Sequence, residues 1–195
     1  MKKIAFVALL SACIATPALA DNIGKFYGAV DLGSVSFSSN VTGGANGTTP
    51  YPKPSAFRFA GGYNITPMFA VEAGYVMIGD SIIDSVGLGK ETIKSSALSV
   101  AGVANIAINN EFGVFGKLGF ANTKMDYTCV LTNGVSCGTA SGSKTNLTFG
   151  LGGQYNINKQ FAIRAQYEDF GKVTPTGANS AAGITMLSIG GIYNF

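Results

Sequence analysis

Few side chains in this sequence could carry out chemistry. The 195 residues include 13 basic and 10 acidic residues and no histidine, which excludes imidazole acid–base catalysis and histidine-ligated metal sites. Six charged residues share one setting, because each lies between the apolar residues of an alternating segment. They are three acids and three bases: Asp31, Glu72, Glu168, Arg58, Lys117 and Arg164. Balanced charges of this kind predict mutual ion pairs if the segments enclose them.

Two cysteines form a second candidate site. Cys129 and Cys137 lie in a polar stretch rich in glycine, serine and threonine. In an exported chain this spacing predicts a disulfide bond. A metal site would need further ligands nearby, and the stretch supplies none, so we predict neither a metal nor a cofactor.

The N-terminus has the pattern of a secretory signal peptide. Met1–Lys3 is basic, Ile4–Ala15 is mostly apolar but too short to span a bilayer, and the stretch that ends at Ala20 has small residues before the predicted cleavage site. This pattern predicts residues 1–20 as the signal peptide and residues 21–195 as one domain.

A rival interpretation makes Cys13 the lipidated residue of a lipoprotein signal. That signal would be unusually short and would ignore the better cleavage site at Ala20. Cleavage after Ala20 removes Lys2 and Lys3 and no acid, which leaves a nearly neutral mature chain.

The composition is that of an apolar chain without a membrane-spanning helix. The sequence is 47% hydrophobic and 12% charged, against about 25% charged in typical soluble domains. This balance argues against disorder, and a small positive charge without basic clusters argues against nucleic acid as the main partner. No run of about 18 apolar residues occurs that would predict a transmembrane helix.

Apolar residues alternate with small or polar residues in eight segments, and a period of two predicts β-strands. The predicted strands are 26–33, 57–63, 69–77, 98–108, 112–120, 147–155, 161–168 and 187–195. Short turns follow the second, fourth and sixth strands, whereas the other connections are long and polar. The predicted long loops are 38–54, 79–95, 122–144 and 171–182. This alternation predicts consecutive hairpins with all short turns at one end.

An internal repeat supports this register. Residues 63–75 and 155–167 each contain Tyr-Asn-Ile, three turn residues and a strand that begins at phenylalanine. The match places Glu72 and Arg164 at equivalent heights on the polar face. The repeat fits hairpin units that close one sheet on itself, and its spacing is too long for a solenoid.

Side-chain chemistry predicts which face of the closed sheet is inside. A water-facing surface would carry dense mixed charge, about 25–35% of its residues, whereas the polar face here is mostly small and uncharged. Such residues suit the narrow lumen of an eight-stranded barrel. The other face carries large apolar residues with aromatic residues near strand ends, as membrane barrels do toward lipid. We therefore predict an all-β, eight-stranded antiparallel up-and-down transmembrane β-barrel.

The six charged residues then form a lumenal charge cluster, made of Asp31, Arg58, Glu72, Lys117, Arg164 and Glu168. Left unpaired, each would cost several kcal/mol, so ion pairs across the lumen are expected. One interpretation is a neutralised, plugged core. The other is a gate, in which the pairs exchange partners and open a thin ion path.

Several strands resemble those of the small outer-membrane β-barrel family, specifically the transmembrane domain of outer membrane protein A. The matching segments are 26–33, 61–63 with 71–75, 162–167 and 186–195. The resemblance implies an inward charged cluster at Glu72, Lys117 and Arg164. Asp31 departs from it, because the best-known member has a base there, so the pairing is expected to be rewired.

The C-terminal residues Tyr193 and Phe195 resemble the signal that is read by the barrel-assembly machinery. The chain ends at the last predicted strand, so we expect no periplasmic peptidoglycan-binding domain and no cell-wall tether. The resemblance implies a monomer in the outer membrane of a Gram-negative bacterium. Its implied partners are lipid, lipopolysaccharide, periplasmic chaperones and the assembly machinery.

Two functions follow from these features. The first is a structural or surface-interaction role, such as envelope integrity or adhesion, with a host or surface ligand bound by the long extracellular loops. The alternative is a narrow ion or small-solute channel gated by the lumenal ion pairs. An enzyme is not expected, because enzymatic barrels of this size call for a catalytic histidine.

Overall fold

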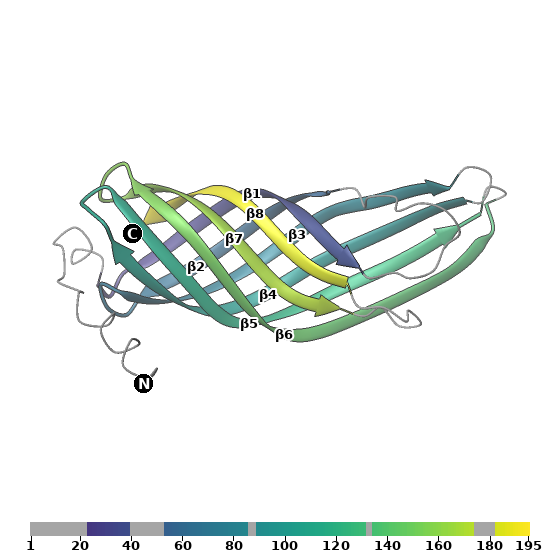
Figure 1. Ribbon diagram of the computed structural model, residues 1–195, viewed down its shortest axis with the longest axis horizontal. Coiled ribbons are helices and arrows are strands. Elements are labelled where there is room, and N and C mark those ends of the chain that lie inside the picture. The colour runs from purple at the N-terminus through teal and green to yellow at the C-terminus, as the bar shows by residue number, and fades with distance from the viewer. Residues whose placement is uncertain (1–22, 40–52, 86–88, 132–133, 174–181) are drawn as a thin grey trace, which may run out of the picture.

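The computed structural model describes residues 23–39, 53–85, 89–131, 134–173 and 182–195. Within them, eight antiparallel strands form a closed barrel in sequence order, which confirms the predicted fold (Figure 1). The strands are β1 (Phe26–Ser39), β2 (Ser55–Asn64), β3 (Phe69–Ser85), β4 (Gly89–Ala107), β5 (Phe112–Val130), β6 (Ser136–Asn156), β7 (Phe161–Val173) and β8 (Ala182–Asn194). The predicted signal peptide lies outside the described residues. No described helix is long and apolar enough to cross a membrane.

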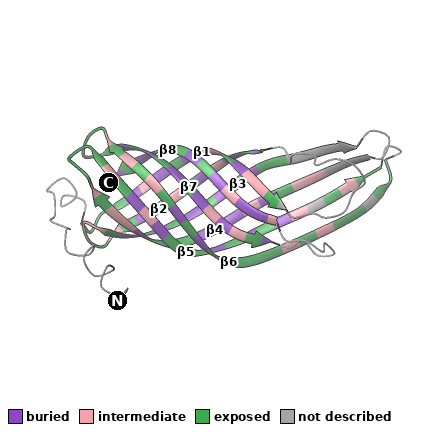
Figure 2. Cartoon of the chain, viewed as in Figure 1, coloured by how far each residue is buried: buried purple, intermediate pink, exposed green. Residues whose placement is uncertain are grey.

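The two faces of the sheet are those that the alternation predicts. Large apolar side chains such as Leu118 and Phe120 are exposed on the outside, whereas Lys117 and Ala121 are buried in the lumen. Figure 2 shows the same alternation of buried and exposed residues along the strands. From Phe112 to Phe120 the chain rises by ~27 Å at ~3.4 Å per residue, or ~21 Å once tilted by ~40°. This height is close to that of the apolar band of outer-membrane barrels, about 25 Å.

The three short turns share one geometry. In each, an isoleucine and the next residue both donate their amide to the carbonyl of a phenylalanine that begins the following strand. The side chain of that next residue, a threonine or an asparagine, accepts the amide of the same phenylalanine. The three turns are Ile65–Phe69, Ile108–Phe112 and Ile157–Phe161. Local side-chain hydrogen bonds of this type favour tight turns, so the same structure forms three times.

Aromatic pairs lie on the outer face at the short-turn end. Phe–Tyr ring pairs join neighbouring strands, with centroids 4.8 to 5.0 Å apart. The pairs are Phe26–Tyr63, Phe112–Tyr155 and Phe161–Tyr193. Cross-strand aromatic pairs stabilise a sheet, and amphipathic tyrosine suits a membrane interface, so these pairs mark one edge of the apolar band.

The prediction of long loops at 79–95 and 122–144 is wrong. In the structure β3 pairs with β4 as far as Ser85 and Gly89, and β5 pairs with β6 as far as Val130 and Ser136. Above the apolar band, polar residues take the outward positions, so the period-two signal fades although the backbone ladder continues. The hairpin strands are therefore long, with 21 residues in β6 against 10 in β2, and they extend past the other strands in Figure 1.

The other two predicted loops, 38–54 and 171–182, lie mainly outside the described residues. Their described ends belong to strands, because β1 continues to Ser39, β7 continues to Val173 and β8 begins at Ala182. The predicted strand ends were therefore too early on the side opposite the short turns.

Candidate functional site

Five strands bring the six members of the lumenal charge cluster together inside the barrel. Asp31 comes from β1, Arg58 from β2, Glu72 from β3, Lys117 from β5, and Arg164 and Glu168 both come from β7. All six are buried, and the most exposed of them is only 5% exposed.

Glycines on adjacent strands make room for these side chains. A Cβ atom at Gly74 would lie 2.9 Å from Nε of Arg58, and one at Gly190 would collide with Asp31. The glycines on the inner face are thus a packing requirement of the charge cluster.

Glu72 is the centre of the cluster. Its Oε1 accepts hydrogen bonds from Arg58 and from Nζ of Lys117, the latter at 2.7 Å. Its Oε2 accepts one from the hydroxyl of Tyr27 at 2.9 Å and one from Arg164 at 2.7 Å. A carboxylate has about four acceptor sites, so Glu72 is fully satisfied by donors from four strands. Tyr27 was not among the predicted site residues, although it lies on the same inward face as Asp31.

Two further ion pairs neutralise the arginines. Arg164 binds both carboxylate oxygens of Asp31, at 2.8 and 2.6 Å, and Arg58 binds Glu168 at 2.8 Å. The bidentate Arg164–Asp31 pair crosses β8, which lies between their strands, so it joins the two sides of the seam where the barrel closes. With three acids and three bases, the cluster has no net formal charge.

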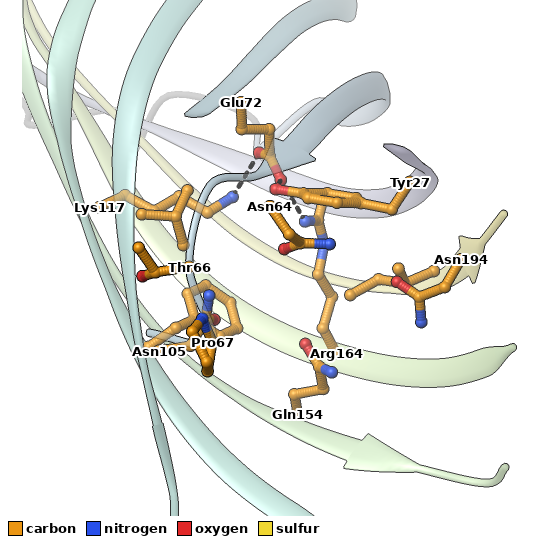
Figure 3. A pocket seen from close by; sticks show the side chains of 13 residues that line it. Tyr27, Asn64, Thr66, Pro67, Glu72, Asn105, Lys117, Gln154, Arg164 and Asn194 are labelled. Carbon is orange, nitrogen blue, oxygen red and sulfur yellow. Dashed lines mark hydrogen bonds and ion pairs between the residues drawn. The ribbon is translucent and has the colours of Figure 1, made fainter. Parts of the chain in front are cut away.

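A small cavity lies between the charge cluster and the short turns (Figure 3). Its volume is about 50 Å³, and Tyr27, Glu72, Lys117 and Arg164 form its inner wall. The amide side chains Asn64, Asn105, Gln154 and Asn194 also line it. This polar space is large enough for a few water molecules. Among the described residues no group of metal-ligating side chains could hold a metal ion.

An apolar plug fills the lumen on the hairpin side of the charge cluster. It consists of Val35, Ala56, Val76, Ile78, Ala97, Ala121, Met125, Phe170, Val173, Ile184 and Met186, all buried. Most of its large members lie beyond the predicted strand ends, so the alternation of residues did not predict the plug. Ion pairs and packed apolar side chains thus occupy the lumen at two successive levels.

The predicted disulfide residues lie on the β5–β6 hairpin. Cys129 pairs with Gly138 in the strand register, which places Cys137 close by in sequence. Cys129 is disulfide-bonded, whereas the side chain of Cys137 lies outside the described residues, so their pairing stays a prediction. Tyr193 and Phe195, the predicted assembly signal, contact each other edge to face with centroids 5.0 Å apart.

Solved structures with the same fold come from several bacteria. The attachment invasion locus protein Ail of Yersinia pestis matches with a TM-score of 0.62 at 18% identity, over 89% of this chain and 99% of Ail. Neisserial surface protein A matches with a TM-score of 0.63 at 17% identity, over 87% and 97% of the two chains. The outer membrane protein OprG from Pseudomonas aeruginosa gives a TM-score of 0.59 at 15% identity, over 89% and 97%.

Among curated protein sequences, none matches this chain. A family model does match, and it covers nearly the whole sequence, residues 5–195. Its description, the outer membrane protein beta-barrel domain, agrees with the closed eight-stranded barrel and its apolar outer face. The chain therefore belongs to the outer membrane protein β-barrel family and is a protein of the Gram-negative outer membrane.

Proposed function

We propose that this protein is a non-catalytic surface protein, in which a closed barrel holds protruding hairpins for contact with ligands outside the cell. One contrast carries the proposal: the lumen is filled by the charge cluster and the apolar plug, whereas β3–β4 and β5–β6 continue past the apolar band. In outer-membrane barrels the short turns are periplasmic and the longer connections are extracellular. Segments held out by a rigid scaffold are where binding residues usually lie.

The first ligand to test is a sulfated polysaccharide. Ail of Yersinia pestis has also been solved in complex with the heparin analogue sucrose octasulfate, and that structure matches this chain with a TM-score of 0.61. On this chain, Lys94 and Lys124 are exposed on the hairpins, each 3.8 Å from a carboxylate. Their charge is partly compensated, so we expect any heparin binding to be weak and salt-sensitive.

A shortened hairpin tests the proposal. Asp126 and Ser141 are cross-strand partners, so residues 127–140 can be replaced by Asn-Gly, which favours a two-residue hairpin turn. This change keeps Met125 in the apolar plug. We expect loss of binding to host cells, with unchanged heat-modifiable gel migration as the control for folding. Heparin binding depends on lysines that this deletion keeps, so Lys94→Ala and Lys124→Ala test it separately. Equal binding by the intact and shortened proteins, or no binding by the intact protein, would contradict a surface-interaction role of this hairpin.

A channel is the second candidate, because the cavity reaches Glu72, Lys117 and Arg164 from the short-turn side. Planar-bilayer conductance decides between the two. We expect a silent membrane for the intact protein and also for Glu72→Ala and Arg164→Ala, because the apolar plug stays packed in both variants. Steady conductance that these substitutions alter would favour the gate instead.

The C-terminal residues are placed where the barrel-assembly machinery could recognise them. The amide of Phe195 donates to the carbonyl of Phe26 at 3.0 Å, and the Phe195 ring is 69% exposed at the short-turn end. We propose that Tyr193 and Phe195 present the signal for the barrel-assembly machinery. Slower insertion of Phe195→Ser into assembly-competent proteoliposomes, with normal stability once folded, is the expected result.

A further inference from the structure

The cavity between the charge cluster and the short turns has an uneven balance of charge on its walls (Figure 3). Among the described residues that line it, the charged ones are Glu72, Lys117 and Arg164, so two bases face one acid. These three side chains belong to buried residues that are 2%, 5% and 2% exposed. The acids that balance this excess, Asp31 and Glu168, do not line the cavity. The lining therefore has one more positive than negative formal charge.

The charged side chains of the inner wall have unused hydrogen-bond donors. The two carboxylate oxygens of Glu72 already accept four hydrogen bonds, about as many as a carboxylate can accept. Nζ of Lys117 carries three N–H groups, and its one acceptor among the described residues is Glu72. Arg164 carries five N–H groups, of which three are used within the described chain, two on Asp31 and one on Glu72. These side chains can therefore donate further hydrogen bonds, whereas the carboxylate can accept no more.

Neutral polar residues connect this wall to the surface at the short-turn end. Asn64 and Thr66 line the cavity there, and Thr66 is exposed. Asn105 also lines the cavity, and its side chain has no hydrogen-bond partner among the described residues. In outer-membrane barrels the short turns face the periplasm. Small periplasmic solutes can thus reach the cavity, and its volume of about 50 Å³ suits a monatomic ion with one or two water molecules.

We propose that this cavity binds a small monovalent anion of the halide class, held by Nζ of Lys117 and the guanidinium of Arg164. A halide only accepts hydrogen bonds, so it matches a wall with unused donors and a saturated carboxylate. Water alone can bind the same donors but leaves the excess positive charge of the lining uncompensated. The cavity and the hairpins lie on opposite sides of the charge cluster, so this site is separate from the proposed surface function.

Bromide can locate the site directly, because its anomalous X-ray scattering distinguishes it from water. Crystals of the protein purified in detergent are grown in sodium bromide. We expect an anomalous peak inside the cavity, in contact with Nζ of Lys117. Peaks on the protein surface with none in the cavity would overturn the inference.

The dependence of folding on chloride tests the site in a membrane. Urea titrations of the protein in phospholipid vesicles are compared in chloride and in gluconate, an anion too large for the cavity, at equal ionic strength. A ligand that binds only the folded state raises the ratio of folded to unfolded protein. We expect this ratio to be about tenfold higher in chloride at the same urea concentration, as for an anion at about ten times its Kd. An equal ratio in the two salts contradicts the proposal.

Three variants separate the cavity from general salt effects. Lys117→Met is expected to abolish the chloride effect, but it also breaks a buried ion pair. Asn105→Leu alters the cavity without changing the charge cluster, and we expect it to weaken chloride binding about fivefold, the effect of one lost hydrogen bond. Lys25→Met, at an exposed lysine of the same end that does not line the cavity, is the matched control and is expected to keep the full effect.

Heat-modifiable gel migration shows whether each variant folds. If Lys117→Met does not fold, Asn105→Leu and the bromide peak decide the question. A chloride effect of equal size in the intact protein and in folded Asn105→Leu would show that chloride acts elsewhere, and the inference would fail.

Discussion

The ion pairs inside the barrel and those on the hairpins have the same chemistry in different surroundings. Within the lumen, Lys117 and Arg164 lie 2.7 Å from the oxygens of buried Glu72. On the hairpins, Lys94 lies 3.8 Å from Asp80, and both side chains are exposed. Burial makes each lumenal charge depend on its partner, whereas bulk solvent can replace a partner on the hairpin. The barrel thus places its structural charges in the lumen.

Removal of the central carboxylate is expected to have the largest effect. Glu72→Ala leaves Arg58, Lys117 and Arg164 with too few acceptors in a closed lumen, so we expect a loss of about 3–5 kcal/mol in the free energy of unfolding. Urea titration of the protein refolded in phospholipid vesicles measures this value. A loss below ~1 kcal/mol, the range of exposed pairs, would abolish the distinction between the two regions.

Two adjacent glycines provide a matched pair of variants at the barrel seam. A Cβ atom at Gly190 would collide with Asp31 and the carbonyl of Val30, whereas one at Gly191 has nothing within 4 Å. We expect Gly190→Ala to cost about 1–3 kcal/mol through overpacking next to the charge cluster. Gly191→Ala, on the outer face, is expected to change stability by less than ~0.5 kcal/mol. Equal effects in the same urea titration would show that Asp31 moves freely.

The short turns allow a test at the rim of the barrel. Asn109 accepts hydrogen bonds from the amides of Glu111 and Phe112, at 2.9 and 2.7 Å. We expect Asn109→Ala to cost about 1 kcal/mol, because exposed amides regain partners in water. Asn109→Thr, which copies the residue at Thr66, is expected to restore most of this stability. Failure of the threonine variant would show that the turns are not equivalent.

The smallest change in the free energy of unfolding is expected from an exposed ion pair on the hairpins. Asp80→Asn removes the partner of Lys94 in an exposed pair, so we expect a change of less than ~0.5 kcal/mol that shrinks further in 1 M salt. The difference between this loss of stability and that of Glu72→Ala under the same conditions measures how much more a buried carboxylate contributes than an exposed one. A loss of several kcal/mol from Asp80→Asn would contradict the assignment of structural charges to the lumen alone.

The sequence predicts this fold well where the membrane imposes a pattern and less well elsewhere. Lipid outside and a narrow lumen inside force strict alternation, so the strands and the inward positions of residues such as Glu72 and Arg164 follow directly. Above the band this requirement ends, so the sequence predicts loops instead of strands after Ile78 and Ala121. The plug was missed for the same reason, since Phe170 lies past the predicted end of its strand.

The sequence alone also could not predict which members of the charge cluster contact each other. Alternation gives the face of a residue but not its neighbours across the lumen, which depend on strand tilt and register. The contacts of Glu72 with Tyr27 and Arg58 are of this kind. A balanced set of charges predicts pairing in general, and only the closed barrel specifies which pairs form.

The shared geometry of the three short turns affects how the barrel sits in the membrane. Each exposes an isoleucine and a phenylalanine at the same end of the barrel, next to the aromatic pairs. Three such anchors around a circumference define a plane, so the inner lipid leaflet holds the barrel axis at one inclination. The fixed tilt of the barrel axis then sets how far the β3–β4 and β5–β6 hairpins protrude from the membrane.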